Sequence, residues 1–309
     1  MTSGPIDKVT MRLVAAMPQS FRSAAHPAVS RFVEQWSPFR WARNRRADVF
    51  FLWFPKTGGT WARLLLHRAL TQHFGITEAP PLELEPLKDF DPRVPRIRPF
   101  HDDAPHWKRP EQLRTHKERY RGRKVMLLVR DPRDAIVSLH LQVTRRWKVD
   151  SDMPLSEFIW RDRGALRTMI RFYNIWAQHR DVPSELLLVR YEDVHADTEG
   201  WLRKMLDFVG VPGVSDAIIR ESVEFNDIAR LRQREQAGQY DTRRLKPGDP
   251  KDPDSFKARK GKIGGFVDYV SRDDAERMTE LIQREMDPWY GYPVDVPLIG
   301  SDAAATSTS

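Results

Sequence analysis

The stretch from Asp48 to Leu66, DVFFLWFPKTGGTWARLLL, constrains the fold more than any other part of the chain. It begins with the apolar run Val49–Phe54, passes through a short loop with two adjacent glycines, and continues with apolar residues at helical spacing. A continuous apolar run of this length is typical of a strand that is buried on both faces of a parallel sheet. The stretch therefore predicts a strand, an anion-binding loop and a helix in direct succession.

Two further segments repeat this alternation of strand and helix. Val125–Val129 is apolar and precedes a helix predicted over Ala135–Leu141, and Leu186–Val189 precedes a helix predicted from Thr198 to Gly210. Short apolar strands separated by helices predict an α/β domain whose central parallel sheet is flanked by helices. Ligands of such sheets bind beyond the carboxyl ends of the strands, so we expect the site in the loops that follow them.

The loop Pro55–Trp61 has the features of an oxyanion cradle. Gly58 and Gly59 allow backbone N–H groups to approach an anion, the start of the helix adds partial positive charge, and Lys56 adds a full charge. In the Walker A loop the lysine follows the last glycine, whereas here it precedes both glycines. A plain strand-to-helix turn is the alternative interpretation of the two glycines.

The loop that begins at Arg130 indicates which anion the site binds. A magnesium-dependent hydrolase usually has an Asp at the end of such a strand, whereas this chain has Arg130 there. The guanidinium suits a phosphate group, and Ser138 can present its hydroxyl on the same side of the following helix. We therefore expect a cationic site without a metal. Asp131, Arg133 and Asp134 can alternatively pair with one another at the helix start.

Four segments, in this order, resemble motifs of the cytosolic sulfotransferase family. PKTGGTW at 55–61 is similar to the family's 5′-phosphosulfate loop PKSGTTW, and RDPRDAIVS at 130–138 is similar to its 3′-phosphate segment RNPKDVAVS. YED at 191–193 and RKGKIG at 259–264 are similar to two further family elements. The resemblance covers residues 48–292 and implies a single α/β domain with a P-loop-like sulfotransferase fold.

The resemblance also implies the reaction and the residues that bind the donor. It implies in-line transfer of a sulfuryl group from 3′-phosphoadenosine 5′-phosphosulfate (PAPS) to a hydroxyl or amine, which releases adenosine 3′,5′-bisphosphate (PAP). The residues implied for the 5′-phosphosulfate are Lys56, Thr57, Gly58, Gly59 and Thr60. Those implied for the 3′-phosphate are Arg130, Ser138, Arg259, Lys260 and Gly261, and those for the adenine are Trp61, Tyr191 and Phe225.

The catalytic residues that the resemblance implies are Lys56 and His101. Lys56 would stabilise the leaving phosphate. The family has a His in a segment of the form KTHLP, and this chain has PRIRPFHDDAPHW at the corresponding place, which makes His101 the expected general base. His106 and His116 are the alternatives for that role.

Three features near the expected site have open roles. Asp102 or Asp103 can orient the imidazole of His101, or either can be a solvated loop carboxylate. Gly59 stands where the family has a Thr. The polar, proline-rich segment Gly238–Lys257 can be a lid over donor and acceptor, or a disordered loop.

The ends of the chain and its composition limit the other functions. The 309 residues include no Cys and carry a formal charge of +8, which excludes disulfides and thiol chemistry and suggests an anionic ligand or a solvated basic surface. No nucleic-acid-binding motif accompanies this charge, so we expect no nucleic-acid partner. No apolar run is long enough to cross a membrane, and a cytoplasmic location fits best.

Three parts of the chain are expected. Residues 1–47 are expected to form a basic arm packed on or near the domain, with contact to a membrane surface as the alternative. Residues 48–295 are expected to form the sulfotransferase domain, and residues 296–309 a disordered tail. The expected acceptor is a small molecule, a carbohydrate or a lipid. The candidates for lining its pocket, which can equally be core residues, are Phe100, Trp107, Trp147 and Trp160.

Two other classes of function compete with sulfuryl transfer. A P-loop-type kinase or nucleoside triphosphatase shares the strand–loop–helix layout, but it is opposed by the missing GK[ST] sequence and by Arg130. A non-catalytic nucleotide-binding protein would keep the pocket and use the basic arm to bind a partner or an anionic surface.

Overall fold

The computed structural model describes residues 46–240, 242–258 and 261–292. Nearly all of the expected basic arm, the expected tail at 296–309, and the predicted ligand residues Arg259 and Lys260 lie outside these ranges. None of the helices within them is both long enough and apolar enough to cross a membrane.

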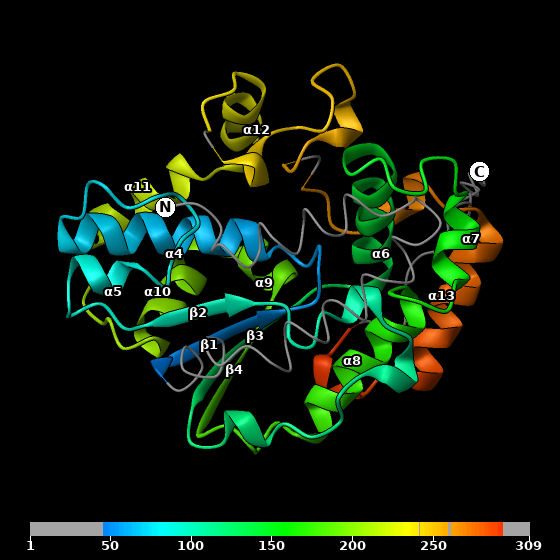
Figure 1. Cartoon of the computed structure of the whole chain (residues 1–309), viewed down its shortest axis with the longest axis horizontal. Helices are drawn as coiled ribbons and strands as arrows, with labels where there is room; N and C mark the ends of the chain where they lie inside the picture. Colours follow the sequence, from blue (N-terminus) through cyan, green and yellow to red (C-terminus); the bar gives the residue numbers. More distant parts are fainter. Residues whose placement is uncertain (1–45, 241, 259–260, 293–309) are drawn as a thin grey trace, which may run out of the picture.

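Within the described ranges, four parallel strands form one sheet in the order β2-β1-β3-β4 (Figure 1). Their bounds are Val49–Trp53 for β1, Ile97–Phe100 for β2, Lys124–Val129 for β3 and Glu185–Arg190 for β4. Strand β1 pairs with β2 and β3, and β3 also pairs with β4. The prediction of a central parallel sheet is confirmed, and its three predicted strands are β1, β3 and β4.

Strand β2 was not predicted, because its sequence IRPF includes a charged residue and a proline. The strand lies at the edge of the sheet and pairs only with β1. At an edge, the missing N–H group of Pro99 interrupts no ladder between two neighbours. Phe100 lies level with Leu52 of β1, so the next residue, His101, emerges at the carboxyl end of the sheet beside Trp53.

Helices cover both faces of the sheet (Figure 1). The side chains of Phe50 and Leu52 face α6 (Pro132–Leu141), α8 (Leu166–Gln178) and α13 (Arg272–Glu285). Those of Val49 and Phe51 face α4 (Gly59–Phe74), α10 (Thr198–Phe208) and α11 (Asp216–Phe225). Because both faces are buried, successive strand residues are all apolar, which explains the uninterrupted apolar runs in the sequence.

Shorter helices and turns connect these layers. They are α5 (Leu87–Phe90), η1 (Pro105–Trp107), η2 (Pro110–Gln112), η3 (Glu118–Tyr120), the π-helical turn η4 (Gln142–Arg146), α7 (Leu155–Trp160), α9 (Tyr191–Ala196), α12 (Ile228–Gln236), η5 (Arg243–Leu245), η6 (Pro253–Ser255), η7 (Gly265–Asp268) and η8 (Pro288–Tyr290). Helix α6 begins three residues before the predicted start, because the Asp131 side chain caps it by accepting from the N–H group of Arg133. Helix α10 ends at Phe208, close to the predicted stop at Gly210.

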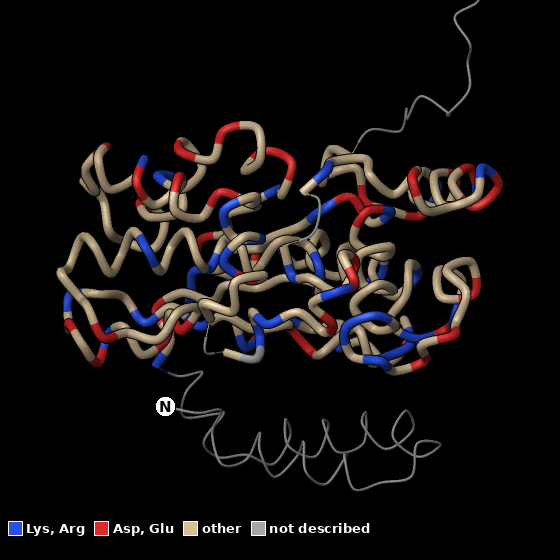
Figure 2. Tube along the Cα trace, turned by 90° about the horizontal axis from the view of Figure 1, so that it is seen from above, with Lys and Arg blue, Asp and Glu red and all other residues tan. Residues whose placement is uncertain are grey.

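Acidic and basic residues alternate along much of the described trace (Figure 2). This mixture agrees with the many ion pairs of the surface, such as Arg203 with Asp216 at 2.6 Å and Arg272 with Glu276 at 2.8 Å. Exposed pairs of this kind contribute little to stability. We therefore expect the basic residues that bind a ligand to lie at the carboxyl ends of the strands.

Candidate active site

The first loop connects β1 to α4 in a strained conformation. Lys56 has a φ of 74°, and Gly58 has a φ of 99° directly before the helix begins at Gly59. Among the described residues, no side chain caps the N-terminus of α4, and its first turn contains no acidic residue. The N–H groups of that turn and the partial positive charge of the helix are therefore available to an anionic ligand.

The two threonines of the loop differ in what they offer to a ligand. The buried hydroxyl of Thr57 donates to the carbonyl oxygen of Phe54 at 2.9 Å, so the side chain fixes the turn against β1. Thr57 can present its backbone N–H group to an anion, but its hydroxyl faces inward. The side chain of Thr60 is only partly buried.

Trp53 explains why Gly59 stands where the family has a Thr. A Cβ atom built on Gly59 would lie 2.3 Å from Cε2 of the Trp53 indole, a distance that no side chain can adopt. The indole therefore occupies the space in which a Thr side chain would begin. Gly58 is constrained in a similar way, because a Cβ atom there would lie 2.6 Å from the ring of Tyr191.

Lys56 joins the first loop to the turn η4, which directly follows α6. Its Nζ atom donates to Oε1 of Gln142 at 3.1 Å. Lys56 and Ser138 line the same small pocket, together with Leu141, Gln142, Arg146, Asp254 and Phe256. Two of the predicted donor-binding residues are thus brought together. Among the described residues, His, Asp and Glu side chains form no group of three that could hold a metal ion.

His101 has a defined tautomer and lies close enough to Lys257 for the lysine charge to affect its pKa. Its Nδ1 atom lies 3.0 Å from the carbonyl oxygen of Trp53, which can only accept, so Nδ1 carries the proton. The other ring nitrogen, Nε2, then has a lone pair that can accept a proton. Burial, with smaller effects from Lys257 and Arg63, lowers the pKa of His101 to about 4. The imidazole is therefore neutral at pH 7, as a general base must be.

Neither interpretation of Asp102 and Asp103 from the sequence is correct. Asp102 is fully buried and accepts from Lys117 Nζ at 2.8 Å and from the Tyr120 hydroxyl at 2.7 Å. Asp103 is also buried and pairs with Lys108. The carbonyl of Trp53 orients His101 instead, and the two carboxylates anchor the chain just beyond it.

The two alternative histidines lie in different places. The ring of His106 lies 5.5 Å from that of His101 and packs against Trp107 and Trp147, at 4.9 and 6.5 Å between ring centroids. His116 is exposed and precedes η3. The geometry places His106 near the pocket as an aromatic neighbour of His101.

The four aromatic residues considered for the acceptor pocket separate into two pairs. Trp107 and Trp147 stack on each other at 6.0 Å with an angle of 15°, close to the two histidines. Trp160 donates from Nε1 to Asp274 at 2.7 Å and packs against the core, as does Phe100. Only the first pair lies on the side of the pocket where His101 presents its ring.

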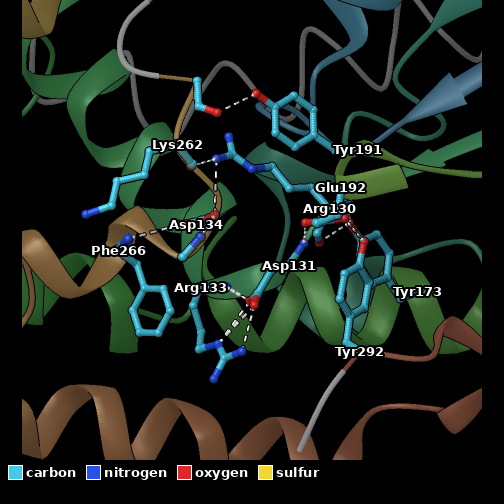
Figure 3. A network of polar contacts seen from close by, with 12 residues as sticks. Arg130, Asp131, Arg133, Asp134, Tyr173, Tyr191, Glu192, Lys262, Phe266 and Tyr292 are labelled. Carbon is cyan, nitrogen blue, oxygen red and sulfur yellow. Dashed lines mark hydrogen bonds and ion pairs between the residues drawn. The ribbon is translucent and has the colours of Figure 1, made fainter. Parts of the chain in front are cut away.

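The second loop forms a dense polar network with the segment that follows RKG (Figure 3). Arg130 donates to Oδ2 of Asp134 at 3.2 Å and to the carbonyl oxygen of Lys262 at 3.1 Å. Asp134 also accepts from the N–H groups of Gly264 and Phe266, both at 2.9 Å. Asp134 therefore fastens residues 262–266 to the start of α6. Burial raises the pKa of the Asp134 carboxyl group.

The expected pairing among the acidic and basic residues of this loop is correct in part. Asp131 and Arg133 form a bidentate ion pair, with Arg133 Nη2 at 2.6 Å from Oδ2. Asp134 instead bonds to Arg130 and to the segment at 262–266. The N–H group of Asp131 donates to Glu192, which is the second residue of the YED segment, at 2.9 Å.

Tyr191 links three of the four motif segments. Its ring lies 4.4 Å from the guanidinium carbon of Arg130, its hydroxyl donates to the carbonyl oxygen of Gly261 at 3.4 Å, and its ring abuts Gly58. The ring of Trp61 lies 5.8 Å away. The predicted residues of the 5′ side and the 3′ side thus meet around one buried tyrosine.

Phe225, the third predicted adenine contact, lies apart from this cluster. Its ring is 38% exposed and is flanked by the guanidinium groups of Arg68 and Arg234, at 4.2 and 3.8 Å. The following residue, Asn226, accepts from Trp61 Nε1 at 2.9 Å through its carbonyl oxygen. This bond brings the end of α11 to the first loop.

The segment Gly238–Lys257 packs over the pocket in the described structure. Arg146 donates to the carbonyl oxygens of Arg244 and Lys246 at 2.9 and 2.6 Å, and Phe256 is buried beside Lys56. Sequence reasoning missed the residues through which this contact reaches the pocket, Gln142 and Lys257, because neither belongs to a motif. The only feature of the sequence that could have indicated them is their distance from predicted site residues: Gln142 lies four residues after Ser138, and Lys257 lies two residues before Arg259.

Comparisons with known proteins show the family and the fold of the chain. Residues 46–289 match the family described as sulfotransferase domain. The chain is 25% identical to the amine sulfotransferase of Oryctolagus cuniculus, with 78% of this chain and 81% of the relative covered, and 25% identical to cytosolic sulfotransferase 13 of Arabidopsis thaliana, with 84% and 79% covered. The fold is similar to that of mouse sulfotransferase SULT7A1 complexed with PAP, with a TM-score of 0.55, 18% identity, and 78% and 85% of the two chains covered.

Proposed function

The chain belongs to the sulfotransferase family of enzymes, and on that premise we propose that it transfers a sulfuryl group from PAPS to a hydroxyl or amine and releases PAP. The observation that best supports this proposal is the convergence of Lys56, His101 and Ser138 at the carboxyl ends of adjacent strands. The acceptor is a small molecule, a carbohydrate or a lipid. Of the relatives, one is named an amine sulfotransferase.

The residues of both loops fit a donor with two phosphate groups. The uncapped N-terminus of α4 and Lys56 fit the 5′-phosphosulfate. Arg130 fits the 3′-phosphate, because its buried Nε atom has no hydrogen-bond partner among the described residues and therefore gains one when an anion binds. Gly261, with the neighbouring Arg259 and Lys260, completes this second group. The complex of the mouse protein with PAP supports the same class of nucleotide.

The residues of the first loop and His101 perform the transfer. PAPS supplies an activated sulfuryl group, whose sulfur forms a bond to the acceptor atom as its bond to the bridging phosphate oxygen breaks. His101 Nε2 takes the proton of the acceptor. Lys56 donates a hydrogen bond to the bridging oxygen, which keeps the electron pair of the broken bond as it leaves.

The low pKa of His101 suits this chemistry. A base of this strength takes the proton late, when the acceptor atom has already become acidic through its new bond to sulfur. Because sulfuryl transfer resembles phosphoryl transfer, positioning and charge stabilisation contribute most of the rate acceleration. The bond from Nδ1 to the Trp53 carbonyl leaves Nε2 as the ring nitrogen that can take the proton.

We propose that residues 48–295 form the catalytic domain, with the arm at 1–47 packed on or near it and the tail at 296–309 outside it. A cytoplasmic location is supported by the relative that is named a cytosolic sulfotransferase.

Two measurements test this function against its rivals. Calorimetry should show micromolar or tighter binding of PAP and no comparable binding of ATP with magnesium, and the opposite preference would favour a nucleoside triphosphatase. Purified protein incubated with isotopically labelled PAPS and a cell extract should yield labelled products by mass spectrometry. Binding of PAP without any labelled product across extracts would favour a protein that only binds the nucleotide.

A further inference from the structure

Two lysine ammonium groups from distant parts of the chain converge on one neutral oxygen. Oε1 of Gln142 accepts from Lys56 Nζ at 3.1 Å and from Lys257 Nζ at 3.3 Å. Gln142 begins the turn η4, one residue after α6, whereas Lys257 ends the segment that packs over the pocket. The segment therefore brings a second cation to the side of the pocket where Lys56 lies.

The surroundings of Lys257 leave its charge without a direct partner. Arg63 of α4, Arg146 of η4 and Arg244 of η5 act on it as cations, and Glu235 of α12 acts as an anion. The carboxylate oxygens of Glu235 accept from the N–H groups of residues 257 and 258, at 2.6 and 3.0 Å, and so hold the backbone. In the described part of the chain, no carboxylate forms an ion pair with the Lys257 ammonium group.

An ammonium group in such surroundings favours an anionic ligand. Burial, followed by the charge of Arg146, lowers the pKa of Lys257 to about 7. The charge of Lys257 in turn contributes to the low pKa of His101, so Lys257 and His101 interact electrostatically. A bound anion would restore the charged form of Lys257 and supply the partner that Gln142, being neutral, cannot supply.

The position of Lys257 assigns it to the transfer end of the site. It shares Gln142 with Lys56, which belongs to the first loop, and its neighbour Phe256 lines the pocket together with Lys56. Arg130, at the other end, bonds to Asp134 and the carbonyl oxygen of Lys262, and no bond joins it to Lys257 among the described residues. The anionic group nearest to Lys257 would therefore be the sulfuryl group.

We propose that Lys257 is a catalytic residue that contacts the non-bridging oxygens of the transferred sulfuryl group, with Gln142 positioning both ammonium groups. This inference rests on the proposed function. Lys56 serves the bridging oxygen that leaves, and Lys257 holds the sulfuryl group in line between that oxygen and the acceptor atom. Because PAP lacks the sulfuryl group, Lys257 contributes to the binding of PAPS but not to the binding of PAP.

Calorimetry with PAPS and PAP tests this distinction. In the Lys257→Met variant, PAP affinity should stay within about twofold of the wild type, whereas PAPS affinity should fall by about tenfold or more, as expected for a lost hydrogen bond between charged groups. Turnover with the acceptor found in the extract assay should fall further, by about 100-fold. An equal loss of affinity for both nucleotides would show that Lys257 only holds the segment in place, and no loss for either would also overturn the proposal.

Two further variants separate charge from structure. Lys257→Arg keeps a cation and should recover most of the preference for PAPS over PAP. Lys251→Met removes an exposed lysine from the same segment and should change neither affinity. In the wild type, PAPS affinity should fall as the pH rises above about 7, because the free ammonium group loses its proton there. This dependence should disappear in Lys257→Arg, and its persistence would contradict the assignment.

The wild-type protein distinguishes failure of this inference from failure of the proposed function. If the wild type binds neither PAPS nor PAP, the proposed function fails and the role of Lys257 fails with it. If the wild type binds both nucleotides and produces sulfated product while Lys257→Met does the same at an unchanged rate, only the inference fails.

Discussion

The two ends of the proposed donor site hold their cations in opposite ways. At the Arg130 end, carboxylates neutralise the charge, because Asp134 pairs with Arg130 and Asp131 pairs with Arg133 (Figure 3). At the Lys56 end, the ammonium groups of Lys56 and Lys257 both donate to the neutral amide oxygen of Gln142, and among the described residues no carboxylate forms an ion pair with Lys257. One end is a preformed network of ion pairs, and the other joins two ammonium groups through a neutral oxygen.

This difference indicates that one end of the site binds the nucleotide and the other end promotes the transfer. A site that only binds a phosphate benefits from a rigid arginine whose position is fixed by carboxylates. A site that stabilises charge developing during a reaction benefits from a cation, such as Lys257, that no carboxylate has already neutralised. We therefore expect substitutions at the Arg130 end to weaken nucleotide binding, and substitutions at the Lys56 end to reduce turnover with binding preserved.

Replacement of His101 should show the largest effect and separate the two ends most clearly. His101→Ala removes the proposed general base, so turnover should fall by about 10²–10⁴-fold. PAP affinity should remain within about twofold, because no nucleotide contact is proposed for this side chain. His116→Ala, which alters an exposed histidine, is the matched control and should be fully active. If His101→Ala kept its turnover, the role of base would pass to another residue, with His106 the next to test.

Replacement of Arg130 should have its main effect on binding. Arg130→Met removes the guanidinium that bonds to Asp134, and PAP affinity should fall by about 10- to 100-fold, as for a hydrogen bond between charged groups. Calorimetry measures this loss directly. Lys262→Met is the control, because the Lys262 side chain pairs with Asp268 and only its carbonyl oxygen contacts Arg130. Unchanged PAP affinity in Arg130→Met would contradict the assignment of the 3′-phosphate.

The contact between Gly59 and Trp53 predicts that Gly59→Ala lowers the stability of the wild-type protein but raises the stability of a variant that lacks the Trp53 indole. Gly59→Ala in the wild type should destabilise the protein by about 1–3 kcal/mol, because the new methyl group overlaps the indole. In a Trp53→Ala background the overlap is gone, and the same substitution should stabilise α4 by up to about 1 kcal/mol, since Ala has the higher helix propensity. Urea unfolding of the four proteins measures both values, and equal destabilisation in both backgrounds would refute the packing explanation.

The pH dependence of kcat/KM for the donor should show the smallest change. His101 must be unprotonated to act, and burial lowers its pKa to about 4, so activity is lost only as the pH falls towards 4. Between pH 6.5 and pH 5, kcat/KM should change less than about twofold. A base with the ordinary pKa of about 6.5 would instead lose about tenfold or more over that range. Such a loss in the rate profile would show that another group, or an exposed His101, limits the reaction.

Much of the fold could be predicted from the sequence, because buried parallel strands carry an unambiguous signal. Strands β1, β3 and β4 have uninterrupted apolar runs, and each is followed by a helix, after a loop for β1 and β3 and directly for β4. Strand β2 lacks this signal, since Arg98 and Pro99 are tolerated only because the strand is an edge. Its position nevertheless decides the site, because it brings His101 beside Trp53.

The site could be predicted only where a motif marks it. The two loops and the YED segment are local patterns, so the meeting of Lys56 with Ser138, and of Tyr191 with Arg130, follows from the order of the strands. Contacts between distant segments have no such pattern. The sequence could not show that Trp53 requires Gly59, nor that Lys257 reaches the amide of Gln142.

The role of the buried carboxylates was beyond the sequence for the same reason. Asp102 resembles a loop residue beside a catalytic histidine, yet its partners Lys117, Tyr120 and Trp176 come from other segments. Burial of a carboxylate with several donors is a tertiary property that sequence spacing does not report.

A crystal structure of the protein with PAP tests the central claim, that one nucleotide spans two ends with different duties, most directly. We expect the 5′-phosphate within hydrogen-bond distance of Lys56 and the N–H groups at the start of α4, and the 3′-phosphate on Arg130 and Ser138. His101 and Lys257 should face the space beyond the 5′-phosphate and contact neither phosphate. A nucleotide bound in the reverse direction, or a 3′-phosphate on Lys257, would contradict the account.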